Sequence, residues 1–207
     1  MKPAAGLAAF VLRVFLWLPA AFAVWYVSAP QYSAVAGAVA NALVDCFAAG
    51  TVSAVERSGL DLSFVTRIEV HPGGGRAGVL LVDVNPLIYT YGLALYLALM
   101  LAARARAWKL LVGAGLLLCF QGWGIALEFL ADIAIKLGPA ISAQVGLAGW
   151  RREAIALGYQ VGCLILPSLA PIVLWALLNR AFIEGMLAPD AFVTAQTRQG
   201  AALMLPR

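Results

Sequence analysis

Apolar residues gather in four long runs, over residues 7–28, 86–103, 108–131 and 154–178, and polar residues lie mostly between them. A helix needs about 20 predominantly apolar residues to cross roughly 30 Å of bilayer hydrocarbon, and each run approaches or exceeds that length. The pattern therefore predicts a mainly α, polytopic membrane protein whose core is a four-helix transmembrane bundle.

In the segment between the first two runs, apolar residues recur first with the period of a helix and then with the period of a β-strand. Val35, Val39, Leu43 and Phe47 recur at helical spacing, which predicts a helix near residues 34–48 on or close to the membrane surface. Apolar and polar residues then alternate over 62–71, a glycine-rich turn follows, and the alternation returns over 78–84. We expect residues 29–85 to form a small extramembrane helix plus a β-hairpin.

Composition agrees with a membrane protein, because 63% of residues are hydrophobic and only 12% are charged. The mean hydropathy is +0.91. The net charge of +4 would suit an anionic partner, but in a membrane protein lysine and arginine mainly set the orientation. We therefore expect membrane lipid around the chain and no nucleic-acid partner.

Orientation follows from the turn after the second run, where Arg104, Arg106 and Lys109 occur without an acidic residue. Such a turn is expected in the cytoplasm. The expected organisation is then a cytoplasmic N-terminus with an uncleaved signal-anchor span (1–28), an external, periplasmic subdomain (29–85), three spans with short loops (86–178) and a cytoplasmic tail (179–207). Arg151 and Arg152 go against this scheme, since it leaves them outside.

Asn85 and Pro86 suit the start of a helix, because Asn is a good N-cap and Pro needs no amide partner in the first turn. On this interpretation they begin the second span, and the tyrosines that follow sit at the membrane interface. The functional alternative makes Asn85, Tyr89 and Tyr91 a polar rim for a substrate or partner segment.

Polar residues inside the third and fourth runs form the second candidate site. Gln121 and Glu128 share a rough helical face of the third run, and Tyr159 and Gln160 occur in the fourth. Ionisable residues are costly inside a membrane and by default indicate a functional face or cavity. The alternative is that Glu128 is solvated near the interface or paired with Lys136 or Arg152.

Catalytic and metal chemistry has little support in the sequence. The three cysteines form neither a CxxC motif nor a Cys/His cluster, so we expect no metal, no cofactor and no catalytic residues. Cys46 and His71 are both expected outside the membrane, where a thiol dyad is conceivable, but no local motif supports it.

Three segments resemble the exosortase H-associated membrane proteins: VNPLIYTYGLAL (84–95), WRREAIALGYQ (150–160) and LILPSLAP (164–171). The resemblance covers nearly the whole chain. It implies a bacterial inner-membrane accessory of a protein-sorting system, in which the exosortase, a polytopic cysteine enzyme, processes proteins that carry a C-terminal sorting helix. The accessory is not itself known as a catalyst, so the resemblance implies no catalytic residues.

Two functions therefore stay open. The first is a non-enzymatic accessory that binds the sorting enzyme or its substrates through the external hairpin and the polar faces of the third and fourth spans. The second is a small transporter or lipid-handling protein with Gln121, Glu128 and Gln160 as its polar pathway.

Overall fold

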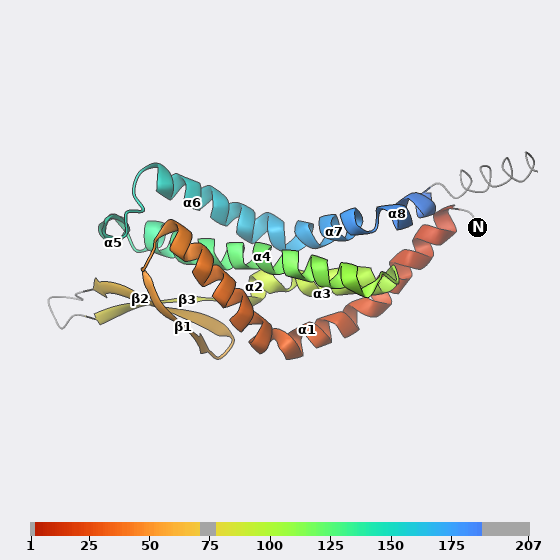
Figure 1. Ribbon diagram of the computed structural model, residues 1–207, viewed down its shortest axis with the longest axis horizontal. Helices are drawn as coiled ribbons and strands as arrows, with labels where there is room; N and C mark the ends of the chain where they lie inside the picture. The colour runs from red at the N-terminus through yellow and green to blue at the C-terminus, as the bar shows by residue number, and fades with distance from the viewer. Residues whose placement is uncertain (1–2, 71–77, 188–207) are drawn as a thin grey trace, which may run out of the picture.

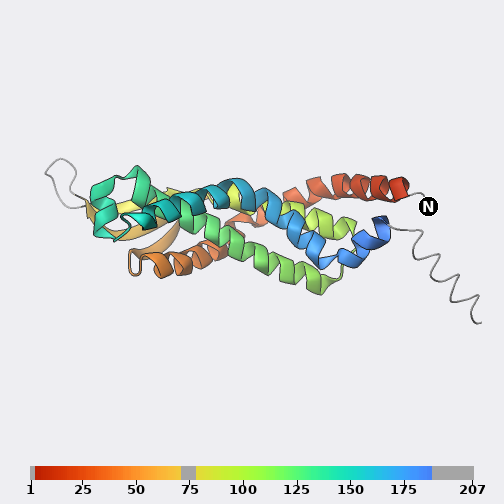
Figure 2. The same cartoon turned by 90° about the horizontal axis from the view of Figure 1, so that it is seen from above.

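The computed structural model describes residues 3–70 and 78–187. Its elements form an elongated molecule, in which the start of α1 and helix α8 lie at one end and the sheet and α5 lie at the other (Figure 1 and Figure 2). We call these the α8 end and the sheet end. His71, the glycine-rich turn and most of the expected C-terminal tail fall outside the described residues.

Helix α1 runs without interruption over Pro3–Phe47, 45 residues. At 1.5 Å per residue it is about 68 Å long, roughly twice the thickness of bilayer hydrocarbon. Figure 1 shows it bent near its middle. Pro30 has no backbone amide hydrogen to donate, and the Ser28 hydroxyl donates to the Val24 carbonyl at 2.8 Å. Both features favour a bend in a helix.

The expected helix near 34–48 is thus the second part of α1 and not a separate element. Its buried stripe also differs from the expected one, because Ala36, Ala40 and Val44 are fully buried whereas Val35 and Phe47 are 52% and 40% exposed. The reason is packing distance. Small side chains let helices approach closely, and the larger apolar residues are left at the margins of the contact.

The sheet has three antiparallel strands in the order β1 (Val52–Ser58), β2 (Asp61–Val70) and β3 (Gly78–Val84). The predicted hairpin is confirmed as β2 and β3, with Phe64 opposite Val82. Strand β1 was not predicted, because most of its residues are exposed and give little apolar alternation. Phe64 is fully buried against Phe129 of α4, with ring centroids 4.7 Å apart, so the sheet packs on the end of that helix.

The second apolar run forms two short helices, α2 (Leu87–Thr90) and α3 (Gly92–Ala102), instead of one span over 86–103. Asn85 and Pro86 precede this segment as predicted, but Pro86 and not Asn85 is the N-cap of α2. The Asn85 side-chain oxygen accepts a hydrogen bond from the Leu87 amide at 2.9 Å. The two helices are separated at Tyr91, and the next residue, Gly92, lies against α7, where an added Cβ would be only 2.3 Å from the Pro167 carbonyl oxygen.

The third and fourth runs form longer helices than expected. Helix α4 (Ala107–Ala131) continues into a π-helical turn at Asp132–Lys136, and α5 (Pro139–Gln144) follows. Helix α6 (Trp150–Gln160) passes through a second π-helical turn (Val161–Ile165) into α7 (Leu166–Leu178), and α8 is Arg180–Leu187.

Three helices are long and apolar enough to cross a membrane: Gly6–Phe47, Ala107–Lys136 and Trp150–Leu178. The fourth expected span is the shorter segment Leu87–Ala102, so helix length alone does not give four spans. At the α8 end, Phe10 of α1 stacks on Trp175 of α7 with ring centroids 5.2 Å apart, and the Lys109 ammonium donates a hydrogen bond to the Leu178 carbonyl.

Candidate functional site

Gln121 joins three helices in the middle of the molecule. Its side chain is 4% exposed, and its Oε1 accepts a hydrogen bond from the Tyr32 hydroxyl of α1 at 2.5 Å. Its Nε2 donates to the carbonyl of Thr90 in α2 at 3.4 Å. Because both halves of the amide are used within the protein, Gln121 holds α1, α2 and α4 together.

Tyr89 and Glu128 form the centre of a second cluster of polar side chains. Tyr89 is 1% exposed, and its ring lies directly on Gly124 of α4. Its hydroxyl faces the Glu128 carboxylate, but neither this hydroxyl nor Oε2 of Glu128 has a well-formed hydrogen bond to any described residue. Buried polar atoms are rarely left without partners, so this pair is the most unusual feature of the bundle interior.

This cluster of polar side chains continues toward the sheet end. Asp132 lies one helical turn beyond Glu128 and pairs with Lys136, with 2.5 Å between its Oδ1 and Nζ. Tyr159 of α6 lies across from Glu128. The ion pair spans the π-helical turn that ends α4, and π-helical turns often occur at functional sites. We call Tyr89, Glu128, Asp132, Lys136 and Tyr159 the Glu128 site.

The structure brings together only part of the sequence-predicted set. Tyr89, Glu128 and Tyr159 meet, whereas Gln121 lies two turns earlier on α4 and belongs to the separate Tyr32–Thr90 contact. Gln160 is exposed on α6, so it does not face Gln121 across a bundle interior. The reason is geometric, because Gln160 is rotated by about 100° around the helix from Tyr159.

The rim proposed for the start of the second span is also divided. Asn85 is exposed just before α2, Tyr91 is half-buried between α2 and α3, and Tyr89 points inward. These three residues therefore do not form one surface.

Sequence reasoning missed Tyr32 and Thr90, the two partners of Gln121. Tyr32 is 89 residues away in the chain, and no local period marks it. Cys46 is exposed, and its thiol donates to the Ala42 carbonyl at 3.4 Å. Across residues 3–70 and 78–187, no group of three or more metal-ligating side chains is close enough to hold an ion.

Comparisons with known proteins gave one match. The family model described as exosortase H-associated membrane protein matches residues 4–182, which includes the sheet and all three membrane-length helices. The comparisons with curated proteins and with solved structures found no match.

Proposed function

Since this chain belongs to the exosortase H-associated membrane protein family, we propose that it is a non-enzymatic accessory of an exosortase-type protein-sorting system. It acts in a bacterial inner membrane and binds the polytopic exosortase or its substrate proteins. The main support for this proposal is the family-model match over residues 4–182, because it covers the sheet as well as the membrane-length helices.

The distribution of charge supports an orientation with both termini in the cytoplasm. At the α8 end the described residues carry mostly cations, namely Arg13, Arg104, Arg106, Lys109 and Arg180, against Glu184. At the sheet end acids outnumber bases: Asp45, Glu56, Asp61, Glu69, Asp83, Glu128, Asp132 and Glu153 against Arg57, Arg67, Lys136, Arg151 and Arg152. The positive-inside rule counts basic residues in short loops beside the spans, and the short turn between α3 and α4 holds Arg104, Arg106 and Lys109 without an acid, so we place the α8 end in the cytoplasm and the sheet end outside.

Cysteine labelling tests this orientation. In a variant without Cys46, Cys119 and Cys163, we expect Leu60→Cys to react with a membrane-impermeant maleimide in spheroplasts. Ala107→Cys, at the start of α4, should react only after the membrane is permeabilised. Leu60 is 48% exposed and Ala107 is exposed, so access to the reagent is comparable. Labelling of Ala107→Cys alone in intact spheroplasts would reverse the orientation.

The Glu128 site is the contact surface that we favour for the partner. Oε2 of Glu128 is buried without a hydrogen bond to any described residue, yet the Glu128 side chain is partly exposed. The neighbouring Lys136 and Asp132 side chains are 57% and 19% exposed, so the site opens to one side. A partner helix would contact the site at the exposed part of Glu128 and at Lys136, and hydrogen bonds between helices favour association inside membranes.

Capture of the exosortase by the tagged chain tests this contact. Glu128→Leu removes both charge and hydrogen bonding, and we expect it to reduce the exosortase recovered severalfold. Glu128→Gln keeps the shape and most of the hydrogen bonding, so it should retain more of the partner. Glu153→Gln is the matched control, because Glu153 is an exposed acid on α6 outside the site.

Other outcomes would count against the proposal. If both Glu128 variants capture the exosortase as well as the wild type does, the contact lies elsewhere. If no exosortase is captured and Gln is as damaging as Leu in a solute-flux assay, ionisation is required, which favours a proton-coupled transporter. The separation of buried Gln121 from exposed Gln160 already counts against that function.

A further inference from the structure

A cleft lies at the sheet end, between the end of α1, helix α4 and the start of α6. It consists of two adjoining hollows, one apolar of about 340 Å³ and one polar of about 700 Å³. The apolar hollow is lined by large side chains from all three helices, among them Phe47, Trp123, Leu127, Trp150 and Ile155. The polar hollow continues along β2 and the α5 region.

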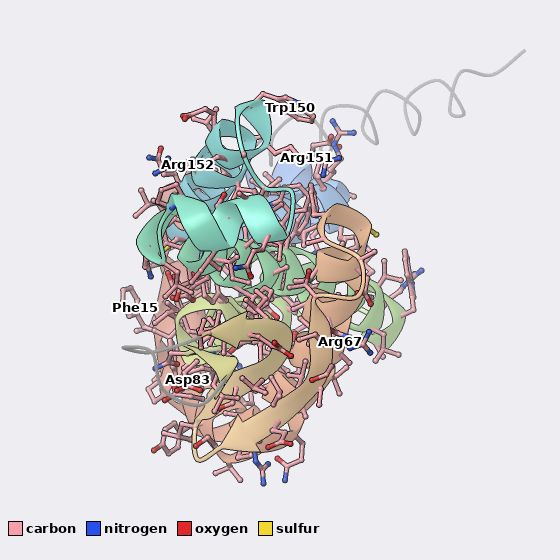
Figure 3. The ribbon with its side chains drawn as sticks, turned by 90° about the vertical axis from the view of Figure 1, so that its left-hand side faces the viewer. Phe15, Arg67, Asp83, Trp150, Arg151 and Arg152 are labelled. Carbon is pink, nitrogen blue, oxygen red and sulfur yellow. The ribbon has the colours of Figure 1, made fainter. Side chains whose placement is uncertain are left out.

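Arg151 stands where the two hollows meet, because it lines both of them. Its guanidinium lies 6.0 Å from the ring centroid of Trp150, and no acidic side chain in the described part of the chain forms an ion pair with it. Figure 3 shows Arg151 and Arg67 on the side where α1 ends, whereas Arg152 points to the other side of α6.

The polar hollow also holds acids, which limits where an anion can sit. Asp45 and Glu69 line it together with Arg67, and the Asp45 carboxylate accepts a hydrogen bond from the Gly50 amide at 3.3 Å. Arg151 is the only charged side chain of the apolar hollow among the described residues. The position best suited to an anionic group is therefore the junction at Arg151.

On helices α4, α6 and α7, the cleft lies near the end of the stripe of exposed apolar side chains. Exposed apolar side chains extend along α4 as far as Trp123, and along α6 and α7 from Leu157 to Leu177. Tryptophans gather at the boundary between hydrocarbon and headgroups, and Trp123 and Trp150 both line the apolar hollow. The apolar hollow thus adjoins hydrocarbon and the polar hollow adjoins water.

The chemistry of the cleft restricts its occupant. An occupant of both hollows needs an apolar part for the apolar hollow and an anionic group at Arg151. A phospholipid has both, an acyl chain and a phosphate. We infer that the cleft binds an anionic phospholipid, with one acyl chain in the apolar hollow and its phosphate on Arg151.

The inference is tested on the full chain, purified in detergent, stripped of lipid and mixed with phosphatidylglycerol or phosphatidylcholine, by counting the bound lipid with native mass spectrometry. Wild-type protein should bind one phosphatidylglycerol more tightly than phosphatidylcholine. Loss of a charge-assisted contact should weaken this lipid by about tenfold or more in Arg151→Gln. Arg152→Gln makes the same change of charge on the next residue and should bind as wild type does.

A second pair of variants tests the acyl chain. Ala154 lines the apolar hollow, so Ala154→Trp should fill it and displace the lipid, while Ala107→Trp at the opposite end should not. Thermal unfolding of each variant shows whether it is folded, and Arg151→Lys should recover part of the binding.

Three results would overturn the inference. Equal binding by Arg151→Gln and Arg152→Gln would remove the phosphate contact. Equal retention of the two lipids by wild-type protein would mean that no anionic headgroup is selected. Full competition by inorganic phosphate, with no effect of Ala154→Trp, would indicate an anion site without a lipid. Exosortase capture is measured separately, so failure here leaves the proposed function untouched.

Discussion

Gly124→Ala is expected to destabilise the folded protein markedly. A Cβ at Gly124 would lie 2.3 Å from Cδ1 of Tyr89, whose side chain is almost fully buried. Gly124 is also closely approached by the π-helical turn between α6 and α7, since a Cβ at Gly162 would lie 3.1 Å from the Gly124 Cα. Overpacking of this kind costs about 1–3 kcal/mol. For a chain of this size, that lowers the midpoint of thermal unfolding by about 2–4 °C per kcal/mol.

Gly115→Ala is the matched control in the same helix. Gly115 is exposed, and an added Cβ meets nothing within 4 Å. Alanine favours a helix over glycine by up to about 1 kcal/mol, so this variant should be as stable as wild type or slightly more stable. Fluorescence-monitored unfolding in detergent compares the two variants. Equal midpoints would show that Tyr89 is not fixed against α4.

Gln121→Leu is expected to have the second large effect. It leaves the Tyr32 hydroxyl and the Thr90 carbonyl without the side-chain partner that they have in the folded protein. A buried polar group that loses its partner costs about 1–3 kcal/mol. The unfolding midpoint should therefore fall, and the helices α1 and α4 should become easier to separate by limited proteolysis.

A double-mutant cycle with Tyr32→Phe identifies the cause. If the Tyr32–Gln121 hydrogen bond carries part of the loss, Gln121→Leu should cost less in the Tyr32→Phe background than in the wild type. Direct measurements between membrane helices average about 0.6 kcal/mol, with a maximum near 1.7 kcal/mol, and we expect a coupling within that range. Strictly additive effects would mean that the two side chains act independently.

Part of the candidate site could be found in the sequence because an ionisable residue is conspicuous in an apolar run. Glu128 and Tyr159 were identified in this way, and they lie together. Gln160 was chosen by the same reasoning but faces outward, because the side of a helix that is buried depends on where its neighbours lie. Arg151 was noticed only as an exception to the charge rule, and its place in a cleft depends on α1 ending beside α6.

The sequence by itself determined the features that arise from local periodicity and composition. These are the apolar helices, the β2–β3 hairpin and the helix start after Asn85 and Pro86, each of which depends on residues close together in the chain. The tertiary structure alone decided which residues meet over long distances, such as Tyr32 with Gln121 and Tyr89 with Gly124. It also made α1 continuous and buried Ala36 and Ala40 instead of Val35, because close helix packing selects small side chains wherever another backbone approaches.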